Sequence, residues 1–329
     1  MLTKKQNFLE TIHGGNPDRF VNQFEYLGMV GGDPIQGQNP RNIRGGGPIV
    51  NAWGVTKDWP ENVPGAFPVH DYEHLVVKDI EHWRDTVHMP RTDFPDEAWK
   101  AYEERAAAID RNEQYVTAMA FPGVFEQLHY LLSIDAALLD FYTNPDEVHE
   151  IIDYITEYEL KVAEQYVKHI HPDALFHHDD WGSHNSSFMS PEMFEEFIVP
   201  AYKKIYGYYK ANGVEIIVHH SDSYAANLVP AMIEMGIDVF QGCVTTNNVP
   251  ALVKEYGGRI SFMGDINNGV VDVKDWTPEL IEREVRRACE TNGKHYFIPN
   301  LTIGGAMSTY PGVYQATSAA IDKMSKEMF

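Results

Sequence analysis

The stretch Val214-Glu-Ile-Ile-Val-His219-His220-Ser221-Asp222-Ser223 places an apolar run directly before a group of polar side chains. A nearly continuous apolar run of this length is typical of a β-strand that is covered on both faces of a parallel sheet. Imidazole, hydroxyl and carboxyl groups at the carboxyl end of such a strand indicate an active site. The alternative is that the two histidines cap the strand and bind loop backbone.

The same pattern recurs along the chain. The stretch Ala174–Gly182 runs from apolar residues into His177, His178, Asp179 and Asp180. Further apolar stretches, each with a polar or glycine-containing end, lie at residues 238–244, 259–267 and 295–300, and earlier strands are expected at 19–26 and 115–121. Repeated units of strand, polar tip and helix predict a single (β/α)8 TIM barrel. Its eighth strand is expected between Gly65 and Arg91.

Length and composition favour one domain over residues 1–329. The chain has 43% hydrophobic and 12% aromatic residues, which is enough for a large core. No Ser/Gly-rich or Pro-rich linker divides it into halves. The segment Gly31–Pro64 has two glycine clusters, several prolines and little periodicity. It predicts an irregular excursion near the mouth of the barrel.

Charge and cysteine content restrict the partners and the compartment. The formal net charge is −22, which argues against nucleic acid or an anionic membrane surface as a partner, because both are polyanions. The two cysteines, Cys243 and Cys289, cannot form a disulfide framework, and no apolar run predicts a signal peptide or a membrane span. We therefore expect a cytoplasmic protein with reduced thiols.

Several ordered landmarks give the chain a family resemblance. They are Asn16-Pro17-Asp18-Arg19, Trp53-Gly54-Val55, Asn144-Pro145-Asp146 and Ser190-Pro191-Glu192-Met193-Phe194 followed by Pro200. From about Asn16 to the C-terminus the sequence resembles the uroporphyrinogen decarboxylase superfamily. The resemblance implies a (β/α)8 barrel whose active cleft lies at the carboxyl face of the strands.

The superfamily resemblance leaves two chemistries open. True uroporphyrinogen decarboxylases carry an arginine-rich N-terminal motif that holds the carboxylates of a tetrapyrrole. The corresponding stretch here, Val21-Asn-Gln-Phe-Glu-Tyr-Leu-Gly28, has no arginine. A site without that bidentate clamp is poorly suited to a polycarboxylate. Arg41 and Arg44 lie in the excursion instead.

The other branch consists of cobamide-dependent methyltransferases, which exchange methyl groups with the cobalt of a corrinoid protein. The resemblance implies that members which methylate thiols hold zinc through a His-x-Cys pair and a further cysteine near the C-terminus. In this chain His219 keeps the first position, but Ser221 occupies the cysteine position and Leu301 stands near the late one. The resemblance therefore does not extend to the usual thiol-activating zinc site.

The remaining donors predict a different metal site. His219 and Cys243 are expected zinc ligands, and Asp222, His220 or a group from His178 to Asp180 would complete the site, with Asp222 the expected third ligand. A catalytic zinc needs three protein ligands with one open position. Cys243 also fits a small buried hydrophobe. The expected catalytic or ligand-orienting residues are His178, Asp180, His220 and Asp265. The expected substrate-lining residues are Tyr26, Phe121, Trp181 and Met263. The alternative is that these four belong to the hydrophobic core and do not contact the substrate.

We interpret the sequence as that of a methyltransferase acting in O-demethylation. It would take a methyl group from a methoxylated, aromatic substrate and pass it to the Co(I) of a separate corrinoid protein. The alternatives are a uroporphyrinogen decarboxylase-type lyase, a methyltransferase with another small methyl donor, and a non-catalytic barrel that binds a corrinoid protein or a small ligand. The last would leave the strand-end histidines and acids too far apart to meet.

Overall fold

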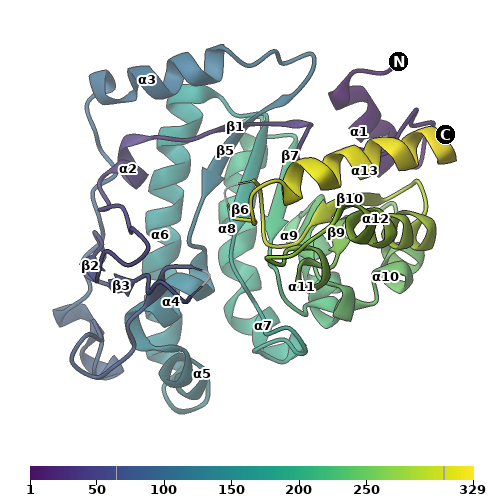
Figure 1. Ribbon diagram of the computed structural model, residues 1–329. Helices are drawn as coiled ribbons and strands as arrows, with labels where there is room; N and C mark the ends of the chain where they lie inside the picture. The colour runs from purple at the N-terminus through teal and green to yellow at the C-terminus, as the bar shows by residue number, and fades with distance from the viewer. Residues whose placement is uncertain (64, 307) are drawn as a thin grey trace.

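The core of the protein is a curved parallel sheet of seven strands. A computed structural model describes residues 1–63, 65–306 and 308–329. The strand order is β1-β5-β6-β7-β8-β9-β10, all neighbouring pairs are parallel, and helices surround the sheet (Figure 1). The strands are β1 (Leu27–Val30), β5 (Tyr115–Ala120), β6 (Ala174–His178), β7 (Ile216–His220), β8 (Val239–Cys243), β9 (Ser261–Ile266) and β10 (Phe297–Leu301). The predicted TIM-barrel-like α/β arrangement is confirmed at this level.

The predicted eighth strand is wrong. In the described part of the chain β1 and β10 are the two edges of the sheet, and no pairing closes it into an eight-stranded barrel. Phe67–Pro68 forms β4, but this strand belongs to a separate antiparallel sheet with β2 (Ile49–Val50) and β3 (Thr56–Asp58). The remaining residues of the predicted region form irregular segments, bends, turns and a 3-10 helix, Ile80–Asp85.

The first strand begins later than the sequence predicts. Residues 23–26 form a turn, and β1 starts at Leu27. Gln23 has a left-handed backbone (φ 53°), which interrupts the extended conformation that a strand requires. Its side-chain amide donates to Ser318 Oγ and to the Tyr314 carbonyl, so the C-terminal helix holds this turn in place.

The helices form the outer layer. They are α1 (Lys4–Ile12), α2 (Pro34–Gly37), α3 (Asp96–Ala107), α4 (Val124–Leu132), α5 (Ile134–Thr143), α6 (Pro145–Ile170), α7 (Pro191–Phe197), α8 (Val199–Ala211), α9 (Val229–Met235), α10 (Val249–Tyr256), α11 (Asn268–Val271), α12 (Pro278–Asn292) and α13 (Val313–Met328). Ser190 and Thr277 cap α7 and α12 through their side chains, and each is followed by a proline in the first turn. None of the described helices is both long and apolar enough to cross a membrane.

The excursion packs beside the long helix α6, as Figure 1 shows. It contains α2, β2 and β3, and its predicted last residue, Pro64, lies outside the described residues. Trp53 is buried and meets Tyr154 and Tyr158 of α6 edge to face, with ring centroids 6.4 and 5.0 Å apart. The excursion is therefore attached to the outer layer by aromatic packing.

Buried side chains form two clusters on opposite faces of the sheet. The interior cluster fills the concave side and includes Phe176, Val218, Val239, Met263 and Ile298. The outer cluster lies between the strands and the helices and includes Leu175, Ile217, Phe240 and Phe262. Since successive residues of a strand point to opposite faces, these clusters tell which face each polar strand-end residue occupies.

Candidate metal centre

Two histidines meet at the carboxyl ends of neighbouring strands. The β6–β7 register pairs His178 with His220. Both follow the interior-facing residues Phe176 and Val218 by two positions, so both lie on the interior face. Their rings are nearly parallel, at 18°, with centroids 4.4 Å apart. The two strand-end clusters found in the sequence are therefore adjacent in space.

Asp180 completes a group that can hold a metal ion. One ligand atom each from His178, Asp180 and His220 lies within 4.8 Å of the other two. The side chains of His178 and Asp180 are partly exposed, so the group is accessible from the carboxyl edge of the sheet. Two imidazoles and one carboxylate are suitable ligands for a catalytic zinc, which keeps its fourth position open.

Hydrogen bonds to Nδ1 orient both imidazoles. Glu126 Oε2 accepts from His178 Nδ1 at 2.7 Å, and Gln241 Oε1 accepts from His220 Nδ1. Gln241 is oriented in turn by donating from Nε2 to Asn300 Oδ1 at 2.9 Å. Among the described residues no hydrogen bond uses Nε2 of either histidine, so both Nε2 atoms are available as ligands. A ligand imidazole held through its other nitrogen is the usual arrangement in metal sites.

Asp179 positions Glu126 although it is not part of the metal group. Its buried carboxylate accepts from the backbone amides of Phe125 and Glu126, at 3.0 and 2.7 Å, and thereby caps the start of α4. It also accepts from Tyr202 Oη at 2.6 Å. Gly123 makes this close approach possible, because a Cβ there would lie 2.4 Å from the Asp179 side chain. The loop after β6 and the start of α4 are thus joined directly beside the site.

The ionisable groups of the site have shifted pKa values. Burial alone would lower the pKa of His178, but the Glu126 carboxylate, with Asp180 and Asp222, raises it to about 10. Burial and the neighbouring His178 lower the pKa of His220 to about 3. Burial and the adjacent Asp180 carboxylate raise the pKa of Asp222 to about 8. At neutral pH, without a bound ion, His178 is therefore protonated, His220 is neutral and Asp222 holds a proton.

His219, an expected ligand, lies on the opposite face of β7. It is fully buried, and its ring stacks on Trp181 with centroids 3.8 Å apart. Tyr206 Oη donates to Nδ1 at 2.7 Å, and Nε2 donates to the Asp179 carbonyl at 3.1 Å. Both ring nitrogens are engaged, so the structure separates His219 from the metal group and gives it the backbone-binding, structural role.

Cys243 and Asp265 also lie outside the metal group, and irregularities in β8 and β9 are the reason. The β8–β9 register shifts between Gln241 and Cys243, where Gly242 has a φ of 86°. Cys243, two residues after the inward-facing Gln241, therefore joins the outer cluster, and burial raises the pKa of its thiol well above the usual value. Asp265 has a φ of 59° and binds Asn292 and Arg287 of α12, at 2.6 and 3.1 Å. A β-bulge reverses the side-chain alternation in this way.

The four expected substrate-lining residues are divided between core and edge. Tyr26 and Met263 are fully buried in the interior cluster, and Tyr26 stacks on Phe8 at 3.9 Å. Trp181 is fully buried in the outer cluster, where its Nε1 donates to Asp179 at 2.9 Å. Phe121 differs, because 45% of its surface is exposed just after β5. It is the one of the four that a ligand at the carboxyl edge can reach.

Glu126, Gln241 and Asn300 hold the site together through the hydrogen bonds described above, and none of them was predicted from the sequence to be a site residue. Gln241 and Asn300 lie within strands that were predicted, on the interior face. Glu126 follows the strand end Phe121-Pro122-Gly123 and lies in the first turn of α4. An acid in the first turn after a strand end is a weak signal, because it also fits a helix that stabilises its own dipole.

Comparisons with known proteins place the chain in a family. Residues 52–324 match the sequence pattern of the family described as uroporphyrinogen decarboxylase (URO-D). No curated protein matches the chain. Among solved structures, a methyltransferase from Methanosarcina mazei aligns over 98% of this chain and 99% of its own, with 17% identity and a TM-score of 0.65. An endo-β-1,4-xylanase from Gloeophyllum trabeum aligns over 70% of this chain and 81% of its own, with 13% identity and a TM-score of 0.39.

Proposed function

The chain belongs to the uroporphyrinogen decarboxylase family, and on this premise we propose that it is a corrinoid-dependent methyltransferase. It takes a methyl group from a methoxylated, aromatic substrate and passes it to the Co(I) of a partner corrinoid protein. The fold shared with a protein described as a methyltransferase is consistent with this proposal but, at 17% identity, shows only the architecture.

The observation that carries the proposal is the group His178, Asp180 and His220 with its two supporting hydrogen bonds. Its donor types, its accessible edge and its anchored Nδ1 atoms fit zinc. Zinc held there would supply a Lewis acid that polarises the leaving oxygen of the substrate. This ligand set replaces the expected set of His219, Cys243 and Asp222, of which only Asp222 lies beside the group.

Asp222 fits the role of proton donor. Transfer of a methyl group from an ether to a nucleophile breaks the oxygen–methyl bond and leaves its electron pair on the oxygen. An alkoxide or phenoxide leaves poorly, so a Lewis acid, a proton or both must stabilise that oxygen. Asp222 is only partly buried, its backbone amide donates to Asp180 Oδ1 at 2.9 Å, and in the protein without a bound ion its raised pKa of about 8 keeps it protonated at neutral pH.

The family's founding reaction is less well supported by the site. A polycarboxylate substrate requires arginines around it. Among the described residues no hydrogen bond or ion pair joins an arginine to His178, Asp180 or His220. Arg44, in the excursion, donates to the Val63 carbonyl instead. A decarboxylase acting on a tetrapyrrole would therefore lack the arginines that bind the carboxylates of its substrate.

The partner is expected at the carboxyl edge of the sheet. Exposed apolar side chains lie there just beyond two strands: Phe121 follows β5 and Ile303, 48% exposed, follows β10. Exposed apolar side chains around an accessible site are suited to contact with a partner protein or with an aromatic ring. They support this docking face without identifying the partner.

The decisive experiment mixes the protein with a corrinoid protein reduced to Co(I). Methoxylated benzoates, methanol, methylamines and methyl thioethers are added in turn, and the visible absorbance of the cobalt reports its methylation. We expect a change with a methoxylated aromatic. Methylation from a different donor would overturn the substrate assignment alone. If none of the donors methylates the cobalt, the assignment as a methyltransferase is wrong.

Matched variants connect the activity to the site. Asp222→Asn keeps the shape of the side chain but cannot donate an acidic proton, and we expect methyl transfer to be slower by roughly 10²- to 10⁴-fold. His184→Ala serves as the control, because His184 is an exposed histidine in the loop after β6. If Asp222→Asn is as active as the control, Asp222 is not the proton donor.

A further inference from the structure

A lysine of the excursion lies beside the helix that supports the metal centre. Lys57 is the middle residue of β3, and its ammonium nitrogen lies 5.0 Å from the centroid of the Tyr130 ring. Tyr130 belongs to α4, and its hydroxyl group donates to Glu126 Oε1 at 3.1 Å. The other oxygen of Glu126 accepts from His178 Nδ1 at 2.7 Å. A continuous series of contacts therefore leads from Lys57 to a residue of the metal group.

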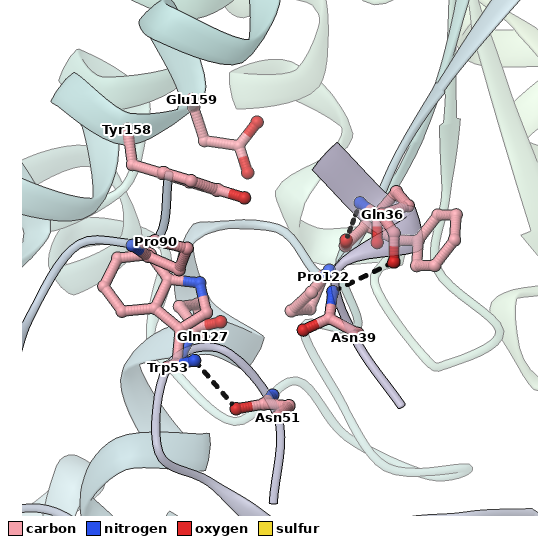
Figure 2. Close-up of a pocket in the computed structure, with 10 residues that line it drawn as sticks. Gln36, Asn39, Asn51, Trp53, Pro90, Pro122, Gln127, Tyr158 and Glu159 are labelled. Carbon is pink, nitrogen blue, oxygen red and sulfur yellow. Dashed lines mark hydrogen bonds between the residues drawn. The ribbon is translucent and has the colours of Figure 1, made fainter. Parts of the chain in front are cut away.

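The excursion holds Lys57 in this place through its own hydrogen bonds. Asn51 Oδ1 accepts from the backbone amide of Trp53, as Figure 2 shows, and from that of Val55, both at 3.0 Å. This turn leads directly into β3, which is the central strand of its small sheet and lies beside α4 (Figure 1). The Trp53 ring packs against α6 and attaches the same turn to the outer layer. The position of Lys57 is therefore set by the fold.

The ammonium group of Lys57 has no anionic partner. Lys57 is only partly exposed, and its ammonium group has neither an ion pair nor a hydrogen bond among the described residues. Glu126 is the nearby carboxylate, but both of its oxygens already accept other hydrogen bonds. Burial lowers the pKa of Lys57, while the negative charge of Glu126 opposes this change. An anion in contact with the ammonium group would favour its charged form, and the described part of the chain does not supply one.

We propose that Lys57 binds a carboxylate of the substrate, carried on the aromatic ring away from the methoxy group. This inference rests on the proposed function, because it takes the metal group as the place of the leaving oxygen. With the ether oxygen at the metal, the ring of the substrate lies beside Tyr130, and the carboxylate lies at Lys57. An aromatic ring packs favourably against tyrosine. One lysine suits one carboxylate, whereas a polycarboxylate requires several bidentate arginines.

The charge of the protein explains why an anionic substrate needs this lysine. The formal net charge is −22, and the site itself contains the carboxyl groups of Glu126 and Asp180. These groups repel an anion that approaches the metal group. A lysine beside the site offsets the repulsion locally. A neutral methyl donor such as methanol would gain nothing from it, so Lys57 favours a carboxylated substrate over a neutral one.

Binding is measured without the corrinoid protein, so that no methyl transfer is needed. The zinc-loaded full chain is titrated by calorimetry with meta- and para-methoxybenzoate and with the corresponding neutral methoxybenzamides. We expect one of the benzoates to bind more tightly than its amide by roughly 10- to 100-fold, because a hydrogen bond between charged groups is stronger than one between neutral groups.

Matched variants assign this preference to Lys57. Lys57→Met keeps the apolar stem and should lose the preference through weaker binding of the benzoate alone, whereas Lys57→Arg should retain it. Lys78→Met is the control, because Lys78 is an exposed lysine that likewise lies 4.9 Å from a tyrosine ring, that of Tyr72. It should bind both ligands as the native protein does. Zinc content and the circular dichroism spectrum should be native in all three variants.

Three results of the titration would overturn the proposal. They are equal affinities of the native protein for each benzoate and its amide, a preference that persists in Lys57→Met, and a Lys57→Met variant that binds both ligands equally weakly. The outcome is separate from that of the cobalt experiment. Benzoates that bind through Lys57 without methylating cobalt would leave this inference intact and contradict the methyl transfer. Cobalt methylated only by methanol or another uncharged donor would do the reverse.

A crystal structure with para-bromobenzoate tests the orientation without any variant. Bromine replaces the methoxy group, and its anomalous signal marks that end of the ring. Bromine at the metal group with the carboxylate at Lys57 supports the proposal. The reversed orientation, with the carboxylate on the metal, or a site without the ligand would contradict it.

Discussion

The imidazole rings of His178 and His220 stack 4.4 Å apart, while His219, the immediate neighbour of His220, lies on the other face of the same strand. The structure therefore distinguishes two donor sets that the sequence offered together. His178 and His220 are anchored through Nδ1 and keep Nε2 free. His219 is buried beside aromatic rings, and both of its ring nitrogens are engaged.

Zinc content should depend on His178, Asp180 and His220, the three residues that the structure brings together. We expect about one zinc per chain in the native protein, and almost none in His178→Ala or His220→Ala, because either change removes one of three ligands. Cys243→Ala and the exposed control His184→Ala should keep the native content. Elemental analysis after dialysis against a weak chelator gives the result. Zinc lost from Cys243→Ala but retained in His178→Ala would favour the set predicted from the sequence.

Glu126 acts by positioning His178. Glu126→Gln should weaken zinc binding by roughly 10- to 100-fold, as is typical when the partner of a ligand imidazole is changed. The circular dichroism spectrum should stay native, since the backbone amide of Glu126 still donates to Asp179. Competition with a chromophoric chelator measures the affinity, with Glu164→Gln, an exposed acid on α6, as the control. Equal affinities of the two variants would show that the Glu126–His178 bond has no influence on the metal.

Tyr206 should contribute stability without affecting the metal. Tyr206→Phe removes the donor to His219 Nδ1 and leaves that buried nitrogen unpaired. We expect the free energy of unfolding in urea to fall by about 1–3 kcal/mol, with the zinc content unchanged. Tyr208→Phe, on the same helix and partly exposed, should be nearly neutral. A loss of zinc in Tyr206→Phe would indicate that His219 influences the metal site after all.

The stability of the native protein should depend on Glu159 between about pH 4.5 and pH 8. Its pKa is raised on folding, so the unfolded chain loses this proton from about pH 4.5 upward while the folded chain keeps it until about pH 8. The favourable contribution is complete below pH 4.5 and is lost as the pH rises through 8.

Glu159→Gln should therefore flatten this decline. We expect the native protein, relative to the variant, to lose on the order of 2 kcal/mol or more between pH 5 and pH 8. Urea denaturation at several pH values measures it. The titratable groups around Glu159 are His177, Asp179, Tyr158, Tyr206 and Tyr209. They are present in both proteins, so the difference between the two isolates Glu159; parallel curves would contradict the buried, protonated carboxyl group.

Local patterns in the sequence predicted most of the secondary structure. The strands that end at His178 and His220 were predicted from their apolar runs. Such a run depends only on residues close together in the sequence. The family resemblance, also carried by short ordered motifs, is confirmed.

The sequence alone determined that imidazoles and carboxylates would gather at the carboxyl ends of parallel strands. The tertiary structure decided which of them meet. Strand alternation gave His219 and His220 opposite faces, the bulge at Gly242 turned Cys243 outward, and Glu126 reached His178 across 52 positions of the chain. The reason is physical: the register and faces of a strand are set by long-range packing against neighbouring strands and helices, which a short stretch of sequence does not contain.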